Sequence, residues 1–127
     1  MLYTVQSNKS PEQAGKDLET AAVRHGFGVL AVHDLQASMA KRNLAFAKAC
    51  RVYEVCQPAQ AKRVLEANLA IATALPCRVA VYEGPHGTTL AMIKPTALLR
   101  LFNQPGLEAT AAEVERAMVA IMDEAAW

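Results

Sequence analysis

Apolar and polar side chains alternate in several short stretches of the chain, and this period of two predicts β-strands. The predicted strands cover residues 1–6, 27–34, 50–56, 77–83 and 88–94. In the second stretch, FGVLAVHD, apolar side chains point to both faces, which favours a central position in the sheet. The sequence GPHG at 84–87 joins the last two strands as a hairpin turn.

Apolar residues three or four positions apart predict amphipathic helices between and after these strands. Helices are expected at 11–25, after a capping serine and proline, and at 58–68, after a second proline. A capping box of Thr110 and Glu113 predicts the start of the last helix. Residues 35–49 have no clean period, so we expect an irregular segment with one helical turn. Shorter helical turns are expected at 69–75 and 95–102.

The predicted order of elements is β-α-β-β-α-β-β-α, which is typical of an α+β fold. The terminal hairpin is antiparallel, and each helix has one apolar face rather than an apolar surface all round. We therefore expect a single domain over residues 1–127, with an antiparallel sheet and helices packed on one face. The other face of the sheet is then exposed to water or covered by a second copy of the chain.

Composition supports a packed core and narrows the choice of partners. The chain has 127 residues, 53% of them apolar, and a formal charge of +1. This balance gives no overall field to attract nucleic acid or an anionic membrane, so we expect neither partner, although a local patch is compatible with it. The longest apolar run, LAIATAL at 69–75, is too short to span a membrane. The first residues lack the pattern of a signal peptide, which predicts a cytoplasmic protein.

Three cysteines, an odd number, favour free thiols in a chain without the pattern of a signal peptide. In its strand, Cys77 shares a face with Val79 and Val81, whereas Arg78 and Tyr82 share the opposite face. The alternation favours Cys77 as a packed core residue, because it turns the neighbouring arginine away from the sulfur. The alternative is a reactive thiol, since Cys77 follows a proline at the mouth of its strand.

Other polar side chains are candidates for a binding site. His33 ends a strand, and the basic run Lys41, Arg42, Lys48 and Arg51 forms either a solvated loop or a site for a small anionic ligand. The binding residues that we predict are Cys77, Arg78, Tyr82, His33, Lys41 and Arg42. The histidines and cysteines lack the spacing of metal ligands, and no catalytic motif is recognisable. We therefore expect no metal, no cofactor and no classical catalytic site.

Four segments, in this order, carry a resemblance to a known family. They are GFGVLAVHDL at 26–35, YEVCQPAQAKRVLEAN at 53–68, LPCRVAVYEG at 75–84, and the following hairpin strand with Pro95 after it. Over residues 1–100 the chain resembles DUF302, a bacterial and archaeal family of domains of unknown function. The resemblance implies a compact α+β domain with an antiparallel sheet, a TATA-binding-protein-like topology and a tendency to dimerise. It implies no activity, although some members are associated genomically with sulfur-handling proteins.

Three hypotheses of function follow. The first is a homodimeric protein without enzymatic activity that binds a small ligand or a partner. The second is a thiol-dependent role through Cys77, either redox sensing or the handling of sulfane sulfur. The third is the binding of an anion or nucleotide by the basic run at 41–51.

Overall fold

Five strands form one antiparallel sheet in the computed structural model, which describes residues 1–127. The strands are β1 (Leu2–Ser7), β2 (Gly28–Asp34), β3 (Cys50–Cys56), β4 (Cys77–Gly84) and β5 (Gly87–Ile93). Their order across the sheet is β1-β5-β4-β3-β2, and every neighbouring pair is antiparallel. The predicted α+β fold with an antiparallel sheet is therefore confirmed.

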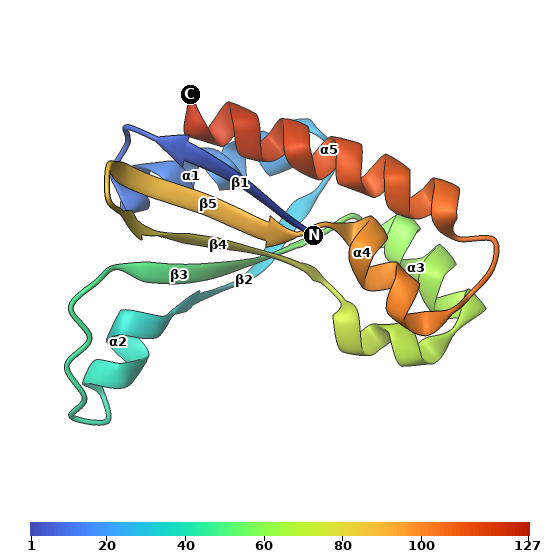
Figure 1. The fold of residues 1–127 in the computed structure, drawn as a ribbon, viewed down its shortest axis with the longest axis horizontal. Helices are drawn as coiled ribbons and strands as arrows, with labels where there is room; N and C mark the ends of the chain where they lie inside the picture. The colour runs from blue at the N-terminus through green and yellow to red at the C-terminus, as the bar shows by residue number, and fades with distance from the viewer.

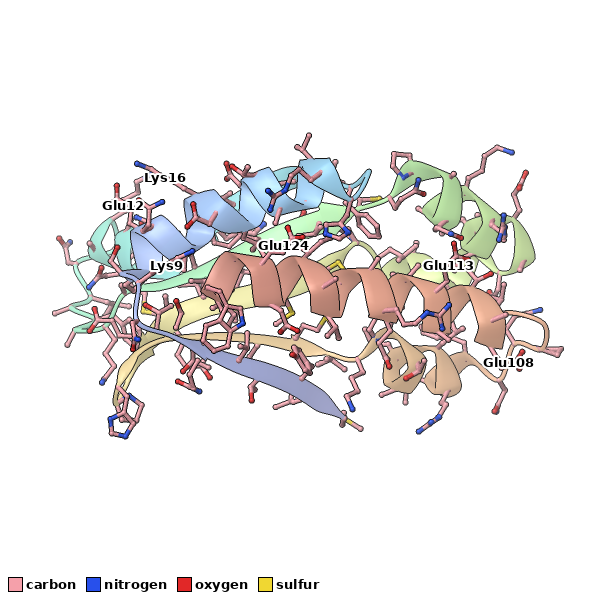
Figure 2. All side chains as sticks on the ribbon, turned by 90° about the horizontal axis from the view of Figure 1, so that it is seen from above. Lys9, Glu12, Lys16, Glu108, Glu113 and Glu124 are labelled. Carbon is pink, nitrogen blue, oxygen red and sulfur yellow. The ribbon has the colours of Figure 1, made fainter.

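Two long helices cover one face of the sheet and lie side by side (Figures 1 and 2). α1 (Pro11–Arg24) connects the two edge strands, and α5 (Glu108–Ala126) ends the chain. Shorter helices gather at one end of the molecule, namely α3 (Pro58–Ala67), the 3₁₀ helix η1 (Leu69–Ala74), α4 (Pro95–Leu99) and the 3₁₀ helix η2 (Arg100–Phe102). α2 (Leu35–Ala40) lies at the opposite end, beside β2 and β3 (Figure 1). None of these helices has the length and apolar character needed to cross a membrane.

Side-chain caps explain where two of the helices begin. At the start of α1, Ser10 Oγ accepts a hydrogen bond from the N–H of Gln13 at 3.1 Å, as the sequence predicts. At the start of α3, Gln57 Oε1 accepts a hydrogen bond from the N–H of Gln60 at 2.7 Å. In both cases a proline occupies the first turn, where its missing N–H leaves no bond unmade.

The start of α5 differs from the prediction. The capping box of Thr110 and Glu113 is wrong, because the helix already begins at Glu108 and no side chain caps it. Leu107, just before the helix, and Thr110, in its first turn, are both buried. Packing against the neighbouring short helices therefore determines where α5 begins, and a local capping pattern does not report on that packing.

The main core lies between the sheet and the two long helices. Its fully buried side chains include Leu18 and Ala22 of α1, Val55, Val79, Val81 and Leu90 of the sheet, and Met118, Ile121 and Met122 of α5. Burying one such large apolar side chain contributes about 1.5–3 kcal/mol. This layer is therefore the largest source of stability in the fold.

Polar contacts at the surface tie α1 to α5 near the C-terminus of the chain (Figure 2). Lys9 Nζ lies 2.6 Å from a carboxylate oxygen of Asp17 and 2.9 Å from the carbonyl oxygen of Ala125. The hydrogen bond from Lys9 lowers the pKa of Asp17. His25 Nε2 lies 2.9 Å from Glu124, and this hydrogen bond contributes most to the lowered pKa of Glu124. The ammonium group of Lys9, near the last turn of α5, also interacts favourably with the negative end of the helix dipole.

The position of the second strand differs from the prediction. β2 is an edge strand rather than a central one, and a bulge interrupts its pairing with β3 between Val29 and Ala31. Leu30 and Val32 are 64% and 43% exposed, so apolar side chains on both faces do not signify burial on both faces here. Strand order depends on where the chain returns after residues 35–49, and hydrophobic periodicity does not encode that return.

No long helix packs on the second face of the sheet (Figure 1). The strand register places Thr4, Ala91, Ala80, Val52 and His33 in one row from β1 to β2. Residues opposite one another in antiparallel strands share a face, so this row lies on the side away from the main core. We call this surface the open face.

Candidate functional site

A cavity of about 70 Å³ lies where the main core meets a smaller hydrophobic cluster. The smaller cluster contains buried Val64, Ile71 and Leu107, with Leu75, Leu99 and Phe102 packed against it. The cavity is lined by the end of β3, the start of β4, the short helices α3, η1, α4 and η2, and the N-terminal half of α5. We call it the strand-end cavity.

Small side chains explain why the two clusters do not close on each other. Ala61 of α3, Ala74 of η1 and Ala111 of α5 line the cavity from three helices. Hydrophobic residues make up 14 of the 19 that line it, and no lysine, arginine, aspartate or glutamate is among them. The cavity therefore suits the uncharged, apolar part of a molecule.

One polar side chain of the lining stands out. Gln60 lines the strand-end cavity, and its Oε1 is buried with no hydrogen-bond partner. The neighbouring Gln57 does not compensate, because its own carboxamide oxygen caps α3. An unpaired buried acceptor costs about 1–3 kcal/mol, and a donor brought in by a ligand would remove that cost.

Cys77 also lines the cavity, at the first position of β4. It packs against the main core on the same side of the strand as Val79 and Val81, as the alternation predicts. Burial raises the pKa of the Cys77 thiol to about 11, and the nearby Cys56 acts in the same direction. The thiol is therefore protonated at neutral pH, which disfavours it as a nucleophile. All three cysteines are free.

Three of the predicted residues lie on the open face instead. His33 Nε2 lies 3.1 Å from Glu54 Oε2, and a guanidinium nitrogen of Arg78 lies 3.6 Å from the same oxygen. Tyr82 is on the same face of β4 as Arg78, opposite Thr89 of β5. Glu54 therefore joins His33 and Arg78 across three strands, but this group does not line the strand-end cavity.

The remaining two predicted residues, Lys41 and Arg42, follow α2 and are exposed at the end of the molecule opposite the cavity. The structure thus places the six predicted residues in three separate regions: the cavity, the open face and the segment after α2. No three histidine, cysteine, aspartate or glutamate side chains come together as metal ligands would.

Sequence reasoning missed Gln60, the residue that distinguishes the cavity. A glutamine in the first turns of an amphipathic helix looks like an ordinary surface residue. Its burial depends on α4, η2 and α5, which are more than thirty residues away along the chain. The only local signal is the sequence PAQA at the start of α3, in which Gln60 has an alanine on each side. These two small side chains let other elements approach the helix.

The fold and the cavity define a small α+β domain with an apolar cavity at one end of an antiparallel sheet. The chain matches the model of the family described as "Domain of unknown function DUF302" over residues 3–125, and it belongs to that family. It is also similar to a crystal structure of an uncharacterized conserved protein DUF302 from Bacillus stearothermophilus. The two are 33% identical, with a TM-score of 0.92 over 98% of this chain and 97% of the other. No curated protein matches the chain.

These similarities confirm the resemblance to the family and extend it. The sequence segments indicated a resemblance over residues 1–100 only. The family match instead continues to residue 125, so it includes most of α5. This extension agrees with the packing, because α5 supplies part of both the main core and the cavity lining.

Proposed function

We propose that this domain binds a small molecule in the strand-end cavity without transforming it. The ligand is apolar, or has an apolar end, and carries one hydrogen-bond donor. The observation that supports this proposal is the buried Oε1 of Gln60, which has no partner in a lining that is otherwise mostly hydrophobic. A donor on the ligand would pair with this oxygen, while the hydrophobic lining would receive the rest of the molecule.

The size of the cavity favours a small organic group over a single water molecule. A water needs only about 10–15 Å³ and two to four polar partners. The strand-end cavity has about 70 Å³, and Gln60 contributes its one buried unpaired side-chain atom. A five-membered ring or a short branched chain would use this space better than water.

Pyrrole and furan provide a matched pair of probes, because both are five-membered rings and only pyrrole donates an N–H. In the native protein, pyrrole should bind more tightly than furan. In Gln60→Leu the ratio of the two affinities should fall about tenfold, since about 1.4 kcal/mol is at stake when the hydrogen bond is lost. Isothermal titration calorimetry on the two proteins measures this ratio directly.

Stability gives an independent check on the same variant. Gln60→Leu should keep or raise the free energy of unfolding, because it removes a buried unpaired acceptor. Gln104→Leu is the matched control, since Gln104 lies in the loop before α5 and does not line the cavity.

The affinity measurement also has an outcome that would contradict the proposed site. This outcome is an equal ratio of pyrrole to furan affinity in the native protein and in Gln60→Leu.

We further propose that two copies of the domain pair through the outer edge of β1. The carbonyl oxygen of Met1 accepts a hydrogen bond from the N–H of Lys94 at 2.8 Å. This bond shows which residues of β1 have their backbone groups bonded to the antiparallel neighbour β5. Every second residue from Met1 therefore bonds to β5, and the backbone groups of Leu2, Thr4 and Gln6 point outward.

The sequence of β1 leaves this edge open to pairing. LYTVQS contains no charge, no proline and no bulge, which are the usual devices that block an edge strand. A two-fold axis at Thr4 would place Thr4 opposite its copy and Leu2 opposite Gln6. All the outward backbone groups of these residues would then find partners, and the sheet would continue from one copy into the other.

Thr4→Lys tests this pairing, because it places two like charges directly opposite each other at the axis. The dissociation constant of the dimer should rise at least about 100-fold, as measured by light scattering or sedimentation. Thr4 is exposed, so the variant should keep the native circular dichroism spectrum. Thr73→Lys, at an exposed position of η1, is the matched control and should remain dimeric. A monomeric native protein, or a dimeric Thr4→Lys, would overturn the pairing.

A thiol-dependent role through Cys77 is the alternative to ligand binding. In its favour, Cys77 and Cys56 both line the strand-end cavity. Against it, burial raises the pKa of Cys77 to about 11, whereas redox-sensing and sulfur-transferring cysteines depend on the thiolate. We therefore place ligand binding first, and a measurement of thiol reactivity decides between the two.

A further inference from the structure

The segment from residue 35 to residue 49, which we call the basic arm, projects from the β2–β3 side of the sheet, away from α5 (Figure 1). The arm has a defined conformation. Asn43 adopts the left-handed conformation with φ 61°, and the N–H of Leu44 donates to the carbonyl oxygen of Met39 at 3.0 Å. Gln36 Nε2 donates to the carbonyl oxygen of Phe46, also at 3.0 Å, and this bond holds the returning chain against α2.

Positive charge is concentrated on this arm. It contains Lys41, Arg42 and Lys48 and no acidic residue, and none of these three cations lies in an ion pair. The whole chain has 13 basic and 12 acidic residues, so without the arm it has 10 basic and 12 acidic ones, a charge of −2. The near-neutral total therefore conceals an arm of charge +3.

Two acidic side chains at the base of the arm are already engaged in other contacts. Asp34 caps α2 by accepting the N–H of Ala37 at 2.9 Å, and it pairs with Arg51. Glu83 accepts the N–H of Ala49 at 2.9 Å. Both carboxylates fasten the arm to the sheet rather than neutralise the cations beyond it.

The same arm exposes two large apolar side chains. Leu44 is 59% exposed and Phe46 is 41% exposed, and both lie between the cations in the sequence KRNLAFAK. Water-exposed apolar groups flanked by lysine and arginine match the boundary of a lipid bilayer, where phosphates lie above acyl chains. A nucleic acid would use the cations, but the arm offers one aromatic ring for stacking and its leucine has no such role.

We propose that the basic arm docks on a bilayer surface that contains anionic lipids. The three cations pair with headgroup phosphates, and Leu44 and Phe46 enter the boundary between headgroups and acyl chains. Each cation contributes about fivefold in affinity, so a single arm gives weak, salt-sensitive and reversible attachment. This proposal does not depend on the strand-end cavity.

Co-sedimentation of the full chain with vesicles tests the proposal. Binding to vesicles of phosphatidylcholine and phosphatidylglycerol in equal amounts should be measurable and reversible, and binding to phosphatidylcholine alone should be about 100-fold weaker. Arg42→Gln should lower the partition coefficient about fivefold, and the triple change of Lys41, Arg42 and Lys48 to glutamine about 100-fold. Arg63→Gln is the matched control, because Arg63 is an exposed cation of α3 outside the arm and should have no effect.

Insertion of the apolar side chains has its own readout. In a Trp127→Phe/Phe46→Trp variant, the only tryptophan is on the arm, and its emission should shift to the blue on anionic vesicles. Equal binding to both kinds of vesicle, or an effect of Arg63→Gln equal to that of Arg42→Gln, would overturn the proposal. So would binding to an acidic protein or to RNA with no binding to anionic vesicles.

Discussion

Replacing Gly15 with alanine should lower the free energy of unfolding by about 2 kcal/mol, although alanine normally stabilises a helix interior by about 1 kcal/mol relative to glycine. Gly15 is buried within α1. A β-carbon at this position would overlap the hydroxyl group of Tyr53 and lie 2.6 Å from its Cζ. Tyr53 is only 3% exposed, so its ring has little room to move away. Overpacking between α1 and β3 should therefore outweigh the gain in helix propensity.

A double-mutant cycle read by chemical denaturation isolates this clash. In a Tyr53→Leu background the three tyrosine atoms nearest to the new β-carbon are absent. There Gly15→Ala should raise the free energy of unfolding by about 0.5–1 kcal/mol, so the effect changes sign between the two backgrounds. If Gly15→Ala stabilises the protein while Tyr53 is present, the close approach of α1 to β3 is not as we describe it.

Cys77 should react at least about tenfold more slowly in the folded protein than in the unfolded chain at neutral pH. A rise in pKa from 9.0 to about 11 reduces the thiolate fraction about 100-fold. The greater nucleophilicity of a more basic thiolate offsets part of this, about tenfold, and burial then restricts access of the reagent. Cys50→Ser/Cys56→Ser leaves Cys77 as the only thiol, so its reaction with an aromatic disulfide reagent is measured alone.

The control and the pH dependence make this prediction specific. Cys56→Ser/Cys77→Ser retains only Cys50, on the open face, and should react faster in the folded state than Cys77 does. Because folding raises the pKa of Cys77, its contribution to stability is present below pH 9 and is lost as the pH rises through 11. Cys77→Ala should remove that part of the pH dependence. Rapid reaction of folded Cys77 at neutral pH would favour the thiol-dependent role over ligand binding.

Local sequence patterns were sufficient to predict those features of the fold that depend on a few neighbouring residues. The period of two assigns Cys77 to the face of Val79 and Val81, and the structure confirms that this face meets the helices. Ser10 and the proline after it marked the start of α1, because a cap forms within one turn. The predicted α+β fold followed from the same local signals, since they determine the order of the elements.

Properties set by distant parts of the chain escaped prediction. β2 lies at an edge because β3 pairs with it only after the basic arm, and no period within 27–34 reports this. The strand-end cavity requires α3, α4 and α5 to meet around small side chains, so the unpaired oxygen of Gln60 becomes visible only in three dimensions. The basic run at 41–51 was visible in the sequence, but the projection of residues 35–49 from the β2–β3 side of the sheet was not, because it depends on how these two strands pair.

A high-resolution crystal structure of the protein with pyrrole tests the central claim most directly, because it locates the ligand atom by atom. We predict the pyrrole ring in the strand-end cavity, with its nitrogen within hydrogen-bonding distance of Gln60 Oε1 and its carbon atoms against the hydrophobic lining. Furan under the same conditions should occupy the cavity less completely. A cavity without pyrrole at saturating concentration, or a ring whose nitrogen points away from Gln60, would contradict the proposed binding function.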